Sequence, residues 1–199
     1  MPNLSNQLEL NRCPHCNVDR PNLPLAWHTQ TDSHSGGSTR FWRVYKCTSC
    51  GGLVTAAAIQ NVGPVTEYYP SGMVIDGSIP GAAGEYLKQA INTLHAPAGS
   101  VMLSASSVDA MLKEKGYTNG SLYSRVNKAV EDHLITSEMA RWAHDIRLDA
   151  NDQRHADQQA TLPTEADAKK CVDFAIALGE FLFVLPARVE RGLAAAEGT

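Results

Sequence analysis

Two Cys-x-x-Cys pairs constrain the fold of this chain more than any other feature of its sequence. Cys13-Pro-His-Cys16 and Cys47-Thr-Ser-Cys50 are separated by 30 residues. A tight turn of this kind supplies two thiolates, and structural zinc takes four ligands in a tetrahedron. The spacing therefore predicts a zinc ribbon with a structural Zn²⁺, because four thiolates leave no open position for catalysis. The expected ligands are Cys13, Cys16, Cys47 and Cys50, and His15 is surplus as a ligand.

The residues beside the second pair have the pattern of β-strands. Residues 40–46 lead into the pair and residues 53–59 lead out of it, and Gly51-Gly52 gives the backbone freedom for the turn. Residues 17–39 are rich in Pro, Gly, Ser and Asn, so we expect a long loop or an irregular hairpin there. Residues 1–12 are expected to be a poorly anchored lead-in.

Aromatic and basic residues alternate irregularly along the strand predicted at residues 40–46. Such a strand can be a platform on which nucleic-acid bases stack. Alternatively, it packs its rings on the helical body of the protein, which is the interpretation we favour. The residues concerned are Arg40, Phe41, Trp42, Arg43, Tyr45 and Lys46.

Helical periodicity begins after a connector that we expect at residues 61–80. Apolar residues then recur at i, i+3, i+4 and i+7, which is typical of helices with one buried face. Thr164-Glu-Ala-Asp167 has the form of a capping box. Pro186 is expected to end or kink the last helix, with a flexible tail at residues 191–199. The predicted helices cover residues 81–94, 98–115, 121–134, 136–155 and 164–184.

These elements predict a mainly α fold. A bundle of about five helices, over residues 81–190, follows a small β zinc ribbon with its lead-in over residues 1–60. The fifth cysteine, Cys171, falls in an apolar helical pattern and is expected to be a small buried hydrophobic residue.

A cluster of polar side chains lies on the helix predicted at residues 136–155. Successive helical residues are turned by about 100° around the axis, so side chains about four apart share one face. The shared face admits a site in which a histidine is the general acid or base and an arginine stabilises a phosphate. It equally admits a polar brace inside the bundle. The residues on this face are Arg147, Asn151, Arg154 and His155.

Charge and hydropathy exclude several classes of protein. The formal net charge is −4, and residues 1–60 carry five basic and three acidic groups, so the remainder is distinctly acidic. That remainder lacks the positive surface on which non-specific nucleic-acid binding depends. The sequence has no 18-residue apolar run and no signal peptide at its start, so we expect a cytoplasmic protein without a membrane span.

The order of these parts resembles the domain of unknown function 4145 family. The resemblance covers most of residues 41–189, and it implies an α-helical bundle like that of the HEPN (higher eukaryotes and prokaryotes nucleotide-binding) domains. It also implies a prokaryotic setting, either as a standalone protein or attached to restriction-type defence enzymes. The features that carry it are the C-x-x-C ribbon, Pro80 before a helix, Arg147-x-x-x-Asn151-x-x-x-His155, Thr164-Glu-Ala-Asp167 and Leu185-Pro186.

HEPN ribonucleases typically carry an arginine, a polar residue and then a histidine, and two copies meet across a homodimer. They cleave RNA without a metal and use the 2′-hydroxyl as nucleophile. Asn151 and His155 match the polar residue and the histidine, but Ala150 stands where the arginine is expected. Arg147 lies one helical turn before Asn151, and Arg154 directly precedes His155.

The sequence therefore supports a favoured function and an alternative. The favoured function is a zinc-binding, HEPN-like helical adaptor, expected to be a homodimer, that recognises a protein or a nucleic acid in a phage-defence or restriction-associated system. The alternative is a metal-independent endoribonuclease that uses Asn151 and His155 with Arg147 or Arg154 across the homodimer. In a third interpretation, Arg147, Asn151 and His155 only brace the bundle.

Overall fold

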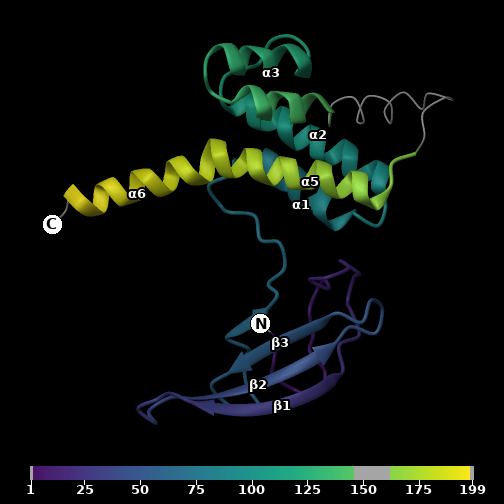
Figure 1. The fold of residues 1–199 in the computed structure, drawn as a ribbon, viewed down its shortest axis with the longest axis vertical. Coiled ribbons are helices and arrows are strands. Elements are labelled where there is room, and N and C mark those ends of the chain that lie inside the picture. The colour runs from purple at the N-terminus through teal and green to yellow at the C-terminus, as the bar shows by residue number, and fades with distance from the viewer. Residues whose placement is uncertain (1, 146–161, 198–199) are drawn as a thin grey trace. The chain divides into compact units, whose positions relative to one another are not determined.

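The computed structural model describes residues 2–145 and 162–197 of the chain (Figure 1). The chain divides into two compact units, Met1–Val74 and Ile75–Thr199. The first unit contains an antiparallel sheet and the second contains helices, so the fold combines α and β structure. Within the described ranges, no helix is both long enough and apolar enough to cross a lipid bilayer.

The first unit is built on a four-stranded antiparallel sheet in the order β1-β2-β3-β4. The predicted strands at residues 40–46 and 53–59 are confirmed as β2 (Thr39–Lys46) and β3 (Leu53–Ala58). β1 (Leu25–Asp32) forms a hairpin with β2, and its register shifts between Leu25 and Trp27. Of the two expectations for residues 17–39, the irregular hairpin is therefore correct. β4 (Glu67–Tyr69) lies within the predicted connector.

The N-terminal segment is a fixed part of the first unit, so the prediction of a poorly anchored lead-in is wrong. The side chains of Leu4 and Leu8 are fully buried. The Leu4 amide donates to the Gly63 carbonyl at 2.7 Å, and the Leu8 amide donates to the Leu23 carbonyl at 3.1 Å. These leucines pack with one face of the sheet. The described residues of this unit form no helix that could cover that face, so the N-terminal segment supplies the apolar surface that the sheet needs.

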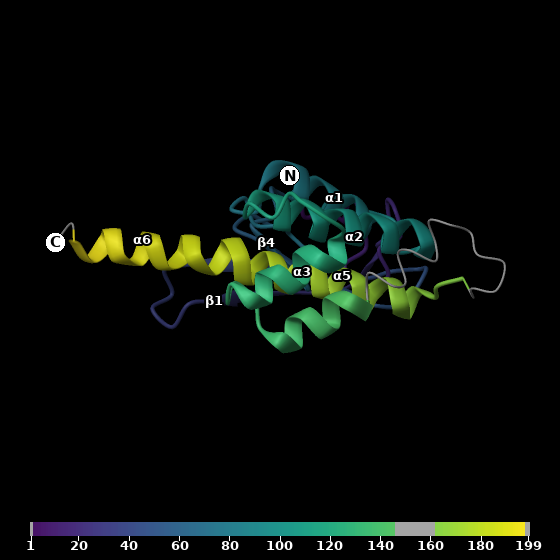
Figure 2. The same ribbon diagram turned by 90° about the horizontal axis from the view of Figure 1, so that it is seen from above.

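The second unit is a bundle of helices (Figure 2). Its core contains Leu87, Val101, Met111, Phe174 and Leu178. The predicted helices over residues 81–94, 98–115 and 121–134 are confirmed with slightly different ends. The elements are α1 (Gly81–Asn92), α2 (Pro97–Glu114), α3 (Leu122–Glu131), a helical segment over residues 137–145, α5 (Glu165–Gly179), the π-helical turn η1 (Glu180–Val184) and α6 (Leu185–Glu197).

The predicted capping box at the start of α5 is confirmed. Thr164 Oγ1 accepts from the Asp167 amide at 3.3 Å, and the Thr164 amide donates to Asp167 Oδ2 at 3.1 Å. Two backbone groups that the first helical turn leaves without intrahelical partners are thereby satisfied. Cys171, one turn later, is 1% exposed and packs in the helical core as expected.

Pro186 does not end the last helix, because α6 continues to Glu197. A proline ring clashes with the carbonyl of the residue four positions earlier in a regular α-helix. That residue is Leu182, which lies in η1, where the chain has a wider π-helical turn. The change of helical geometry just before Pro186 accommodates the ring. Residues 191–197, where the sequence predicts a flexible tail, are therefore part of α6.

Candidate metal centre

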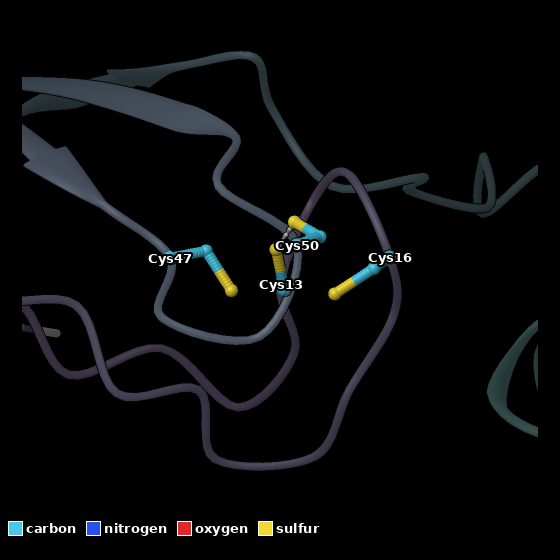
Figure 3. A group of neighbouring side chains, drawn as sticks. All are labelled: Cys13, Cys16, Cys47 and Cys50. Carbon is cyan, nitrogen blue, oxygen red and sulfur yellow. Dashed lines mark hydrogen bonds between the residues drawn. The ribbon is translucent and has the colours of Figure 1, made fainter.

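The two Cys-x-x-Cys pairs come together at one end of the sheet of the first unit. The sulfur atoms of Cys13, Cys16, Cys47 and Cys50 all lie within 4.8 Å of one another (Figure 3). All four are free thiols, and the Cys13 and Cys50 sulfurs are 4.0 Å apart. Tetrahedral zinc with Zn–S bonds of about 2.3 Å would hold its sulfurs about 3.8 Å apart. The four thiols therefore fit a metal ion of this kind, and the structure brings together the cysteines that the sequence pairs.

The two turns have the same backbone geometry. In the first, the Asn17 amide donates to the Cys13 carbonyl at 2.9 Å; in the second, the Gly51 amide donates to the Cys47 carbonyl at 2.8 Å. Asn17 and Gly51 both have a positive φ, of 56° and 76°. Asparagine and glycine are the residues that adopt this conformation most readily. The residue four positions after each first cysteine thus closes the turn.

Backbone amides also point at the sulfurs. The His15 amide lies 3.4 Å from the Cys13 sulfur, and the Gly52 amide lies 3.4 Å from the Cys50 sulfur. An N–H group directed at a sulfur favours the negatively charged thiolate, which is the form that binds a metal. The backbone of both turns is therefore arranged to stabilise bound thiolates.

The buried thiols of Cys13 and Cys47 differ in acidity. Burial raises the pKa of the Cys13 thiol. Burial also disfavours the Cys47 thiolate, but hydrogen bonds from the Cys50 and Ser49 amides, together with those from the Cys13 and Cys50 thiols, outweigh that effect and lower the pKa of Cys47 to about 7. Cys47 is thus the more acidic of these two thiols before a metal binds. Metal binding would release the remaining protons, since the ligand is the thiolate.

His15 holds the two turns together without being a ligand. Its Nε2 atom lies 2.8 Å from the Leu53 carbonyl oxygen, directly after the second turn. Its ring also lies against Gly52, where an added Cβ would stand 2.5 Å from the His15 Cδ2 atom. Only glycine at position 52 leaves room for this ring. From the sequence, His15 has no expected role, because it is not needed as a ligand. Its role depends on the contact with Gly52, which is 37 residues away, and no local sequence pattern predicts such a contact.

The side chains of β2 alternate between two faces of the sheet. The sequence predicts this strand to be either a platform for stacked bases or a strand that packs its rings. Tyr45 is fully buried, and its hydroxyl donates to the Ser5 carbonyl at 2.8 Å. Arg43 is 9% exposed and donates to the Asn61 carbonyl at 3.0 Å. Both belong to the face that the N-terminal segment covers. Arg40, Trp42 and Lys46 alternate with them and lie on the opposite face.

The polar cluster of Arg147, Asn151, Arg154 and His155 lies outside the described residues, so its geometry stays a prediction. The helical segment over residues 137–145 that precedes it is held by two aromatic contacts. The His144 ring stacks on Tyr123 with ring centroids 4.2 Å apart, and Trp142 meets Phe174 edge-on at 5.0 Å. His144 Nε2 also lies 2.9 Å from Asn127 Oδ1.

The comparisons with known proteins bear on the helical unit. The family model named "domain of unknown function (DUF4145)" matches residues 88–195, which is 108 of the 199 residues. The match begins within α1 and ends within α6, so it spans the helices and leaves out the four cysteines. No curated protein and no solved structure matches the chain.

Proposed function

Since this chain belongs to the DUF4145 family, and since it joins that domain to a four-cysteine site, we propose that it is a zinc-binding adaptor. The single observation that carries the proposal is the convergence of four cysteine sulfurs within 4.8 Å. An all-cysteine donor set is typical of structural Zn²⁺. With no ligand position left for a substrate, this metal stabilises a surface that binds another molecule.

The size of the first unit supports a structural role for the metal. Its core is a cluster of ten buried apolar residues beside a four-stranded sheet. A core of this size provides little stability, and small domains commonly depend on a metal. Structural zinc contributes on the order of 10–16 kcal/mol of apparent binding free energy, which in such sites is folding free energy. In this proposal, zinc stabilises the fold of the first unit and thereby keeps its binding surface in shape.

A homodimer is part of the proposal, and α6 supports it. This helix extends from η1 beyond the other helices of its unit (Figures 1 and 2). Its apolar side chains Leu185, Val189 and Leu193 are 50%, 53% and 61% exposed. α6 continues the helix of α5 and η1, but a helical segment of 13 residues that lacks tertiary packing is only marginally stable in water. A second copy that packs on these side chains would stabilise the helix and bury its apolar face.

The proposal includes a biological setting, which comes from the resemblance described above. In it, the helical unit has the HEPN-like arrangement, and the adaptor acts in the cytoplasm of a prokaryote, in a phage-defence or restriction-associated system. Its partner there is a protein or a nucleic acid.

The zinc proposal is tested by metal analysis of purified full-length protein. We expect about one zinc per chain, bound through the thiolates, and loss of that zinc in Cys47→Ser. Cys171→Ala is the matched control, because Cys171 is buried in the helical unit and should not affect the metal content. Zinc-free wild type that is folded throughout, or a Cys47→Ser variant with full zinc content, would refute the proposal.

The homodimer is tested by analytical ultracentrifugation. Val189→Glu introduces a charge on the exposed apolar face of α6, so we expect it to convert a dimer into a monomer. Glu190→Gln alters the adjacent, exposed position and should leave the dimer intact. A wild type that sediments as a monomer at micromolar concentration would remove the homodimer from the proposal, while the zinc site would be unaffected.

A further inference from the structure

One face of the sheet in the first unit carries exposed rings and cations, and we call it the outer sheet face. Side chains alternate between the two faces of a strand, and the strand register shows which positions lie together. Trp27 pairs with Val44, Val44 with Thr55, and Thr55 with Tyr69, so these residues form one row across all four strands. The outer sheet face consists of Trp27, Thr29, Thr31, Arg40, Trp42, Val44, Lys46, Leu53, Thr55, Ala57, Glu67 and Tyr69.

The core of the first unit does not use the rings on this face. The core lies on the opposite face, where Tyr45 and Val54 pack with the N-terminal segment. On the outer sheet face, Trp27 is 59% exposed and Tyr69 is 54% exposed. Neighbouring strands are about 4.8 Å apart, so Trp27 and Tyr69, three strands apart, stand roughly 14 Å from each other. Because these two large aromatic side chains are exposed, a ligand that lies across the sheet could contact both of them.

Trp42 lies in the neighbouring row of the outer sheet face, where it pairs with Thr29 and Ala57, and its ring is held in a fixed position. Its indole Nε1 donates to Thr31 Oγ1 at 2.9 Å, and the ring is half-buried. Glu67 fixes the neighbouring groups, since it accepts from the Tyr69 hydroxyl at 2.9 Å and from Arg40 Nη1 at 2.5 Å. The face is therefore preorganised, and little conformational entropy remains to be lost when a ligand binds.

The charges on the face suit an anionic ligand. Arg40 and Lys46 lie on β2, two residues before Trp42 and two residues after Val44. Glu67 is the single carboxylate among the outer-face residues, and Arg40 already neutralises it. In the part of the chain that the structure describes, no carboxylate is within ion-pair distance of Lys46. The face therefore carries a net positive charge, which is located at Lys46 because Arg40 is paired with Glu67.

We propose that the outer sheet face binds single-stranded nucleic acid, with unpaired bases stacked on Trp27, Trp42 and Tyr69 and a phosphate near Lys46. An aromatic ring stacks with any base, and a four-stranded sheet with exposed rings can hold two or three of them. A protein partner suits the face less well, because the centre of a protein–protein interface is depleted of lysine, whereas here Lys46 lies beside the rings. This proposal rests on the adaptor function and names its partner.

The interaction should be weak and independent of base sequence. The net charge of −4 provides no long-range attraction for phosphate, so affinity depends on the rings and on few cations. We expect a Kd of about 10⁻⁶–10⁻⁴ M for a short oligonucleotide at physiological salt.

The test is fluorescence anisotropy of labelled 12-mers of deoxythymidine and uridine with full-length, zinc-loaded protein. We expect saturable binding, weakened about tenfold by Trp27→Ala, because one stacked base is lost. Lys46→Gln should weaken binding and reduce the slope of log K against log salt concentration by about 0.7, the value for one contact with a single strand. Tyr86→Ala and Lys88→Gln are the matched controls, since both alter exposed side chains of α1 and should leave the affinity unchanged.

Zinc content and circular dichroism of each sample separate the outcomes. Absence of saturable binding by a protein that contains zinc and is folded would overturn this proposal and leave the zinc adaptor standing. Binding that Trp27→Ala and Tyr69→Ala do not change would overturn it as well. A defined protein partner whose binding is lost in Trp27→Ala, with no oligonucleotide bound, would assign the face to protein recognition instead. A duplex bound as tightly as the single strand would contradict base stacking.

Discussion

At the scale of single residues, Gly52 is the position near the metal centre where a side chain has the least room. An added Cβ would come within 2.5 Å of the His15 ring. We expect Gly52→Ala to displace His15 and to destabilise the first unit by about 1–3 kcal/mol, the typical effect of overpacking. The measurement is the rate of zinc transfer to a chromogenic chelator, which should increase. Gly37→Ala is the control, since its added Cβ would meet only Ser35 Oγ at 3.7 Å, an ordinary contact. Equal rates for the two variants would show that His15 does not hold the turns together.

In the helical unit, Arg125 is a residue whose replacement should reduce stability. It is 8% exposed, pairs with Asp109 on α2, and donates to the Gly120 carbonyl at 2.7 Å. Removing one partner of a mostly buried pair leaves a carboxylate and a carbonyl with weaker hydrogen bonding. We therefore expect Arg125→Ala to lower the free energy of unfolding by about 2–4 kcal/mol, measured in urea. Lys128→Ala, an exposed change on the same helix, should have little effect; a similar loss in both variants would contradict this role.

The predicted ribonuclease site can also be tested at the level of one residue. The adaptor proposal expects no RNA cleavage, because Ala150 occupies the position where HEPN ribonucleases carry an arginine. Purified wild type and His155→Ala, incubated with RNA and EDTA, should therefore give the same negligible cleavage. Metal-independent cleavage by the wild type that is absent from His155→Ala would instead establish the endoribonuclease.

At the scale of elements, the N-terminus of α5 depends on its capping box. The Thr164 hydroxyl, the Thr164 amide and Lys170 hold the pKa of Asp167 at about 2, against an ordinary value of 3.8. Because the folded-state pKa is depressed, the stabilising contribution of Asp167 is complete above about pH 4 and is lost as the pH falls towards 2. Thr164→Ala should cost about 1 kcal/mol near neutral pH and flatten this acid dependence. Thermal unfolding followed by circular dichroism between pH 6 and pH 2 measures both.

Asp173→Asn is the control for this acid dependence, because it alters an exposed carboxylate later in α5. A profile for Thr164→Ala that is parallel to that of the wild type would show that the capping box is not its source.

The sequence predicts best those elements that are stabilised by residues close together in the chain. α1, α2 and α3 follow from apolar periodicity, and the start of α5 follows from a hydrogen-bonded pair three residues apart. β1 and β4 are predicted less well, because their residues are mostly exposed or polar and they become strands by pairing with β2 and β3. The prediction for the N-terminal segment is wrong for the same reason, because Leu4 and Leu8 are buried only by packing against the sheet.

At the scale of the whole molecule, the two units should respond differently to metal removal. The first unit contains the four-cysteine site and a small core, whereas the helical unit has a larger core and none of these four cysteines. We expect a strong chelator to unfold the first unit and to leave most of the helical circular dichroism, because the proposed structural zinc would couple metal binding to folding in the first unit. The fluorescence of Trp27 and Trp42 reports on the first unit, and a Trp142→Phe background removes the signal of the second. Parallel loss of the helical signal would contradict independent stability of the units.

The amino-acid sequence alone is enough to predict which cysteines share a site, that a helical unit follows them, how α5 is capped and which family the helices resemble. Each of these depends on residues that are close in sequence or on a pattern that repeats within one element. Three features become visible only in the three-dimensional fold. His15 braces the second turn, the N-terminal segment covers the sheet, and Trp27 and Tyr69 share a face with Trp42. These depend on contacts between distant segments, and the strand register that creates them is set by packing across the whole sheet.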